Sequence, residues 1–184
     1  MGKMSMDHEP RLGIDIGNVI MAGDNDALFG RSGGYSEQRM LGIPEMPGAV
    51  DAIAQLIALF GPEQVYLVSK AHKNTEAKTL RWLARHDFCA RTGLDERHIW
   101  FCRERPEKAV ICGWLGITHY VDDREDVLEP MCGVVPHRYL FGSQSFVAPD
   151  GLVAVPDWAT AEVAIREDYS LMEESRSFEE TRRD

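Results

Sequence analysis

Several short stretches of the sequence end in side chains that are suited to phosphate and metal chemistry. Asp15 ends the apolar run R-L-G-I-D-I, and Ser69 follows the apolar run Q-V-Y-L-V. Asp122 and Asp123 follow a third such run, T-H-Y-V, and Lys108 lies shortly after the run I-W-F-C. An aspartate at the end of a buried strand can attack phosphorus and form an aspartyl-phosphate, although a capping or turn role is the simpler alternative for Asp15 taken alone.

The roles of Ser69 and Lys108 follow from where they stand in the predicted elements. The Ser69 hydroxyl and the backbone N–H groups after it can bind phosphate oxygens, or the serine can form a simple turn. Lys108 falls in the first turn of a predicted helix, where the helix dipole favours anions over cations. A bound anion would explain a lysine there, and a solvated surface lysine is the alternative.

The adjacent carboxylates of Asp122 and Asp123 indicate a cation site. Two anions side by side are unfavourable unless a positive charge lies with them. Hard oxygen ligands at the end of a strand suit Mg²⁺, which needs few protein ligands and retains water. We therefore expect Mg²⁺ near these two residues and Asp15.

These residues need a scaffold that brings distant parts of the chain together, and the hydrophobic pattern predicts one. Short apolar runs alternate with segments of helical periodicity, which is typical of an α/β fold with a parallel sheet and helices on both faces. In such folds the functional groups lie at the carboxyl ends of the strands. The predicted strands cover residues 11–16, 64–68, 99–102, 118–121 and 134–141, and the predicted helices cover 47–60, 74–86, 106–115, 124–131 and 157–166.

The chain of 184 residues has the length of one domain. We expect a flexible leader over residues 1–10 and a folded domain over residues 11–166. Within that domain, glycine and proline punctuate residues 22–47, which predicts a loop or small flap outside the core. Residues 167–184 are rich in acidic side chains and poor in apolar ones, which predicts a disordered tail.

Composition excludes several classes of partner. With 20 basic and 30 acidic residues the net charge is −10, which argues against binding to a nucleic-acid backbone or an anionic membrane surface. No apolar run has the length of a membrane span, and the polar start does not read as a signal peptide. The four cysteines show no paired framework, so we expect reduced thiols and a cytoplasmic location. A phosphorylated substrate remains compatible with an acidic protein, because a few local cations and a metal can bind it.

The order of the motifs resembles the haloacid dehalogenase-like hydrolase superfamily. The matching stretches are G-I-D-I-G-N-V-I, Y-L-V-S-K, R-P-E-K and Y-V-D-D-R-E-D-V, and the resemblance covers residues 11–166. The stretches M-P-G-A-V-D-A-I and R-W-L-A-R-H are most similar to the branch that includes 5′-deoxyribonucleotidases. The resemblance implies a Rossmann-like sheet with a minimal cap and a magnesium-dependent phosphatase.

The resemblance also implies a role for each matching residue. Asp15 would be the nucleophile, and Ser69 and Lys108 would neutralise the phosphoryl oxygens. Mg²⁺ would be held by Asp15, the carbonyl of Gly17 and Asp123, with Asp122 in support. Lys70 and Asn18, which belong to two of the same motifs, are further candidates for phosphate binding.

One position departs from the superfamily pattern. The phosphatases usually carry a second aspartate two residues after the nucleophile, where it acts as general acid and base, and here that position is Gly17. Such a group typically contributes about 10²–10⁴-fold to the rate, and Asp24, Asp26 or a group of the substrate are candidates to replace it. The leading hypothesis is a phosphatase acting on a phosphomonoester such as a nucleotide or sugar phosphate. The alternative, based on Gly17, is a non-catalytic regulatory or binding protein.

The short segment over residues 22–47, after the first predicted strand, also indicates what kind of substrate the site can accept. It leaves little chain for a cap that encloses a small substrate. An open site would suit a macromolecular phosphoester as well as a small molecule, or would need a second copy of the chain to cover it.

Overall fold

A computed structural model describes residues 9–23, 37–142 and 149–182. Within these ranges six parallel strands form one sheet in the order β3-β2-β1-β4-β5-β6. The α/β, Rossmann-like sheet expected from the sequence is thus confirmed. The strands are β1 (Leu12–Ile14), β2 (Val65–Lys70), β3 (Ile99–Cys102), β4 (His119–Asp122), β5 (His137–Phe141) and β6 (Val153–Val155).

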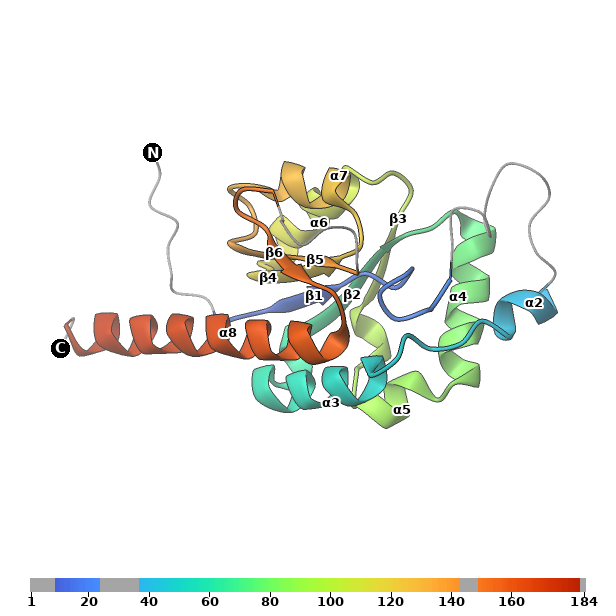
Figure 1. Ribbon diagram of the computed structural model, residues 1–184, viewed down its shortest axis with the longest axis horizontal. Helices are drawn as coiled ribbons and strands as arrows, with labels where there is room; N and C mark the ends of the chain where they lie inside the picture. Colours follow the sequence, from blue (N-terminus) through green and yellow to red (C-terminus); the bar gives the residue numbers. More distant parts are fainter. Residues whose placement is uncertain (1–8, 24–36, 143–148, 183–184) are drawn as a thin grey trace.

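Helices cover both faces of the sheet, as Figure 1 shows. Helices α6 and α7 lie on one side, and α3, α5 and α8 lie on the other. The short helix α2 lies next to α4, away from the centre of the sheet. The described helices are α2 (Glu37–Leu41), α3 (Ala49–Phe60), α4 (Lys73–Arg85), α5 (Phe88–Thr92), α6 (Glu107–Leu115), α7 (Glu125–Leu128) and α8 (Trp158–Thr181), with short 3-10 turns at Pro62–Gln64, Glu96–His98 and Glu129–Met131.

The topology places a crevice at the position where the chemistry was expected. From β1 the chain builds the sheet outward through β2 to β3, and then returns to the other side of β1 as β4. Ligands bind to open parallel sheets at this kind of reversal, beyond the carboxyl ends of the strands. Asp15 directly follows β1, and Asp122 ends β4 beside it.

Close contact between β1 and β4 requires a glycine at position 13. A Cβ atom built on Gly13 would lie 2.6 Å from the ring of Tyr120. The Tyr120 ring fills that space, and its hydroxyl donates a hydrogen bond of 2.6 Å to the carbonyl of Val68 on β2. Tyr120 therefore ties together the three strands whose ends carry the candidate site.

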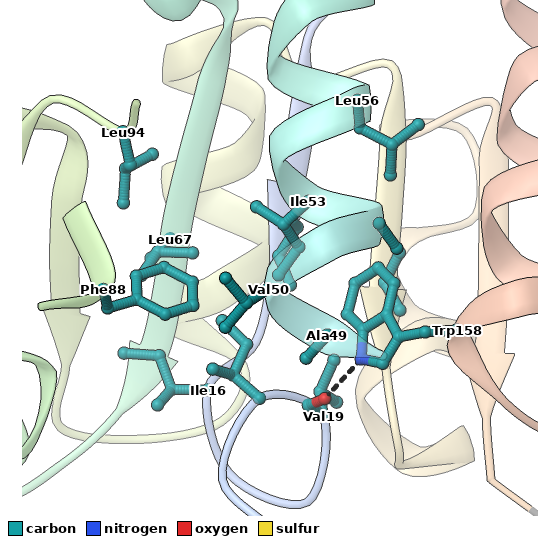
Figure 2. Packing of buried hydrophobic residues seen from close by; sticks show 14 of the residues in the cluster. Ile16, Val19, Ala49, Val50, Ile53, Leu56, Leu67, Phe88, Leu94 and Trp158 are labelled. Atoms are coloured by element: carbon teal, nitrogen blue, oxygen red, sulfur yellow. Dashed lines mark hydrogen bonds between the residues drawn. The ribbon is translucent and has the colours of Figure 1, made fainter. Parts of the chain in front are cut away.

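The loop after β1 is fixed by a residue from the far end of the chain. Trp158 is fully buried at the start of α8, and its Nε1 donates a hydrogen bond of 2.7 Å to the Val19 carbonyl. Figure 2 shows this bond beside the packed side chains of α3, including Ala49 and Ile53. The segment that follows Asp15 is thus held by the core rather than by local turns alone.

Residues 22–47 were expected to form a flap outside the core, but the last part of this segment contributes side chains to the core. Residues 24–36, which include Asp24 and Asp26, lie outside the described residues, and so do residues 1–8 of the predicted leader. The returning half contributes Met40 and Ile43 to the core, and Trp82 Nε1 donates a hydrogen bond of 2.8 Å to the Ile43 carbonyl. The prediction that none of residues 22–47 belongs to the core is therefore wrong for this half.

The prediction of a disordered tail after residue 166 is also wrong in the described part. Helix α8 continues without a break to Thr181. About one turn beyond Ile165, Tyr169 packs on Phe60 with ring centroids 4.6 Å apart, and Asp168 accepts a hydrogen bond of 2.7 Å from the Tyr139 hydroxyl. These contacts hold the helix against the core past the expected boundary. The apolar spacing of the sequence did not predict them, because it cannot show that an aspartate accepts a hydrogen bond from a buried tyrosine.

The end of the sheet opposite the crevice contains a buried histidine. His119 is fully buried, its ring stacks on His137 with centroids 4.6 Å apart, and its Nε2 has no hydrogen-bond partner among the described residues. Its Nδ1 lies 2.7 Å from the Thr118 hydroxyl. Burial, with a smaller effect from His137, lowers the pKa of His119 to about 3.

We expect His119 to make folding pH-dependent. Its folded-state pKa lies below the ordinary value of about 6.5. Between these two pKa values, His119 therefore binds a proton in the unfolded chain but not in the folded chain. The resulting loss of stability is absent above about pH 6.5 and grows by about 1.4 kcal/mol per pH unit below it, until the folded pKa is reached. Urea unfolding at pH 7 and pH 5 should show that His119→Phe loses about 2 kcal/mol less than wild type on acidification. Equal losses in the two proteins would contradict this assignment.

Candidate active site

The residues predicted to do chemistry converge on one pocket of about 200 Å³. It lies at the carboxyl ends of β1, β2 and β4. The predicted site residues on its wall are Asp15, Gly17, Asn18, Ser69, Lys70, Lys108 and Asp123. Asp122 is fully buried and contacts Lys108 rather than the pocket. The other predicted residues therefore share the pocket wall, and Asp122 lies one layer further in.

Lys108 is the electrostatic centre of this site. It is almost completely buried, and its Nζ lies 2.9 Å from Asp15 Oδ1 and 2.7 Å from Asp122 Oδ2. The alternative of a solvated surface lysine is therefore wrong. Burial alone would lower the pKa of Lys108, but the charges of Asp122 and Asp15 outweigh it and raise that pKa. Lys108 is therefore a permanent cation beneath the pocket.

The clustered carboxylates outnumber the buried ammonium of Lys108. One carboxylate oxygen from each of Asp15, Asp122 and Asp123 lies within 4.8 Å of the others. Burial raises the pKa of Asp122 to about 7, with Asp15 adding to the effect and Lys108 opposing it. Burial also raises the pKa of Asp123. Three close carboxylates with one lysine favour a further cation.

The donor atoms fit a hard divalent cation. Asp15 Oδ1 is buried, and no described donor reaches it with hydrogen-bond geometry, although Lys108 is close enough for an ion pair. The set offers carboxylate oxygens only, with no sulfur or imidazole, which matches the preference of Mg²⁺. Asp15, Asp122 and Asp123 therefore fit the expected metal.

Asn18 has a structural role that the sequence did not reveal. Its φ of 56° lies in the left-handed region, whereas Gly17 before it is not among the residues with positive φ. The Asn18 side chain donates a hydrogen bond of 2.8 Å to Asp123 Oδ2. This bond crosses from the β1 loop to the β4 loop, so Asn18 orients a candidate metal ligand in addition to lining the pocket.

The outer wall of the pocket carries residues that sequence reasoning only partly found. His72 and Arg105 lie in the loops after β2 and β3, and both line the pocket. Thr75 and Thr79 on α4 and Arg124 after β4 also line it and were missed. The two threonines stand one helical turn apart in a polar helix start, a pattern too common in solvent-facing helices to single them out.

Arg103 lies in the same loop as Arg105, and its side chain contacts the loop and the helix that follow β2. Its guanidinium lies 2.6 Å from Glu76 and bonds to the Ala71 carbonyl. Glu107 accepts hydrogen bonds from the backbone N–H groups of Arg103 and Glu104. Arg103 thus fixes the loop between β2 and α4 and does not line the pocket.

Two general expectations can be compared with the described residues. All four cysteines are unpaired thiols, as expected. Among the described helices, none combines the length and the apolar character needed to cross a membrane.

Comparison with known proteins identifies the fold. No protein-family profile and no curated protein matches the sequence. Two solved structures match the three-dimensional structure at 15% sequence identity each. One is the D,D-heptose 1,7-bisphosphate phosphatase from Burkholderia thailandensis, with a TM-score of 0.54 over 85% of this chain and 97% of that one. The other, named as a haloacid dehalogenase-like hydrolase from Burkholderia xenovorans LB400, has a TM-score of 0.58 over 87% of this chain and 98% of that one.

Both similarities span nearly the whole of the related chain, so they concern the complete fold and not one βαβ unit. They agree with the resemblance seen in the four sequence motifs. The chain therefore has the fold of the haloacid dehalogenase-like hydrolases.

Proposed function

We propose that this protein is a Mg²⁺-dependent phosphatase that acts on a phosphomonoester through an aspartyl-phosphate on Asp15. The observation that supports this most strongly is the position of Asp15. Its carboxylate lies on the pocket wall, 2.9 Å from the buried Lys108 ammonium and within 4.8 Å of the other two carboxylates. A hydrolase-type fold in both structural neighbours agrees with this function.

The residues divide the work of phosphoryl transfer between them. Ser69 and Lys108 would bind the phosphoryl oxygens while the Asp15 carboxylate attacks phosphorus and the ester oxygen departs. Water would then cleave the acyl phosphate and restore Asp15. Because phosphoryl transfer depends chiefly on positioning and charge neutralisation, the buried ammonium of Lys108 is as important as the nucleophile.

Asp15, Asp123 and the Gly17 carbonyl would hold Mg²⁺, with Asp122 behind them, and the bound ion would neutralise negative charge on the phosphoryl group. Asn18 would keep Asp123 in position through its hydrogen bond of 2.8 Å. Without the ion, the three carboxylates repel one another.

Metal binding can be tested without any activity. Saturating Mg²⁺ should raise the melting temperature of the wild-type protein by on the order of 5–10 °C at 100 times its Kd. Asp123→Ala should abolish this rise. Asp126→Ala is the matched control, because Asp126 pairs with Arg124 outside the carboxylate cluster. An equal rise in wild type and Asp123→Ala would locate the metal elsewhere.

The substrate class is narrowed by the pocket. Its volume of about 200 Å³ suits a phosphoryl group with a small organic part. Lys70, Arg105 and Arg124 on the outer wall favour an anionic or hydroxylated substrate, such as a nucleotide or a sugar phosphate. One neighbour is a phosphatase of a sugar bisphosphate. Phosphate release from a broad panel of phosphomonoesters, with Mg²⁺ and with EDTA, tests the proposed function directly.

The alternative function is a regulatory or binding protein that retains the fold, and it rests on Gly17. A protein without a proton donor at that position could bind a phosphorylated partner without hydrolysing it. Two results together would favour this alternative. No phosphate would be released across the panel, and phosphate with Mg²⁺ would raise the melting temperature of the protein in a saturable way.

A further inference from the structure

The missing general acid leaves a chemical gap that the proposed function must fill. Gly17 lines the pocket but carries no side chain. An alkoxide leaving group needs a proton as its bond to phosphorus breaks, and the attacking water must later lose one. A positioned side chain that performs these transfers is worth about 10²–10⁴-fold in rate.

The described residues that line the pocket offer few groups for this task. Asp15 is the proposed nucleophile, and Asp123 is bonded to Asn18 and assigned to the metal. Lys108 is fixed between Asp15 and Asp122. Lysine and arginine side chains retain their protons near neutrality, whereas histidine ordinarily exchanges its proton between about pH 5 and 8. His72 is the one histidine among the described residues of the pocket wall.

His72 is also available for proton transfer. It is exposed to solvent and precedes α4 as its N-cap residue. Its backbone carbonyl accepts a hydrogen bond of 2.9 Å from the Glu76 N–H, while its side chain makes no capping bond. The backbone is therefore fixed by the helix, and the imidazole, which has no bond or ion pair to another described residue, remains open to substrate and water.

We propose that His72 is the general acid and base of this phosphatase. It takes the place of the aspartate that is replaced by Gly17 in this chain. This assignment rests on the proposed function of the same site. In the first step the Asp15 oxygen forms a bond to phosphorus, the bond from phosphorus to the ester oxygen breaks, and the imidazolium of His72 gives its proton to that oxygen. In the second step the neutral imidazole takes a proton from water, whose oxygen attacks phosphorus and releases the Asp15 carboxylate.

Charged groups of both signs line the pocket that His72 also lines. They are the cations Lys70, Arg105 and Arg124 and the carboxylates Asp15 and Asp123. Glu76, one turn into α4, is paired with Arg103. The three cations favour binding of a phosphorylated substrate in the pocket that the imidazole lines.

The leaving group provides the sharpest test. His72→Gln should lower phosphoenzyme formation from an alkyl phosphate such as glycerol phosphate by about 10²-fold or more. Formation from acetyl phosphate should continue at the wild-type rate, because its leaving group needs no proton. The phosphoenzyme formed from acetyl phosphate should nevertheless persist longer in His72→Gln, since the base for water is missing. Rapid quenching at timed intervals measures both steps, and Lys73→Gln is the matched control on the adjacent exposed residue.

Two rescues separate a chemical role from a structural one. Added imidazole should restore alkyl phosphate cleavage to His72→Ala, because the exposed site admits the small base. Gly17→Asp combined with His72→Gln should restore it as well, since Gly17 lines the pocket and is not among the residues with positive φ.

The outcomes distinguish failure of this assignment from failure of the proposed function. If His72→Gln cleaves alkyl phosphates at the wild-type rate, the assignment is overturned, and a loss in Asp24→Asn or Asp26→Asn would identify the donor instead. If the wild type cleaves acetyl phosphate but no alkyl phosphate, the assignment also falls. The phosphomonoester substrate of the proposed function falls with it, while attack by Asp15 on phosphorus stands. If the wild type cleaves neither, both are overturned.

Discussion

Asp15→Asn should remove phosphatase activity and leave the fold intact. The amide nearly matches the carboxylate in shape but cannot form an acyl phosphate. Activity should fall to the background of the assay on every substrate that the wild type cleaves. The comparison is best made with an activated substrate such as acetyl phosphate, which requires no general acid and therefore reports on the nucleophile alone.

A folding control is essential for this variant, because Asp15 also pairs with Lys108 at 2.9 Å. The circular dichroism spectrum and the cooperative thermal transition of Asp15→Asn should match those of a folded domain. Since the substitution removes one of several repelling carboxylates, we expect no large loss of stability in metal-free buffer. Wild-type turnover in a folded Asp15→Asn protein would exclude the covalent mechanism.

Lys108→Met should cause a large loss of stability. Lys108 is the buried cation that offsets Asp15 and Asp122. Removing one partner of a buried ion pair typically costs about 3–5 kcal/mol, because the remaining charge is left without compensation. We expect a loss of that order in the free energy of unfolding, measured by urea titration in EDTA at pH 8, where the carboxylates are most strongly ionised.

Two further variants show whether the loss arises from charge. Lys108→Met combined with Asp122→Asn should recover part of the stability, because the fully buried carboxylate is then neutral. Lys70→Met is the matched control, since Lys70 lines the same pocket but is only partly buried. A loss in Lys70→Met equal to that in Lys108→Met would show that the effect comes from the pocket surface and not from the buried pair.

Much of the site could be predicted because strand ends carry a strong sequence signal. Asp15, Ser69 and Asp122 each follow a short apolar run, and the topology of a parallel sheet brings such ends together. The sequence pattern could not show how deeply each of these side chains is buried. Asp122 and Asp123 are adjacent in sequence, yet one contacts Lys108 in the interior and the other contacts Asn18 at the pocket.

The parts of the fold that were missed depend on contacts between distant residues. Strand β6 is a three-residue edge strand, too short to produce a periodic pattern. The core position of Ile43 depends on a bond from Trp82, and the extension of α8 depends on Tyr139 and Tyr169. A glycine-rich or acidic segment looks solvent-exposed until such a partner is known, so composition alone misjudged both.

The proposed mechanism depends on a covalent bond between Asp15 and phosphorus. The most direct measurement is to mix the wild-type protein with acetyl phosphate and Mg²⁺, quench with acid, and locate the added phosphoryl group by peptide mass spectrometry. We predict that the protein gains the mass of one phosphoryl group on the peptide containing Asp15. The same gain should be absent in Asp15→Asn and in EDTA. Phosphate release without any labelled Asp15, or a label that persists in Asp15→Asn, would contradict the covalent mechanism.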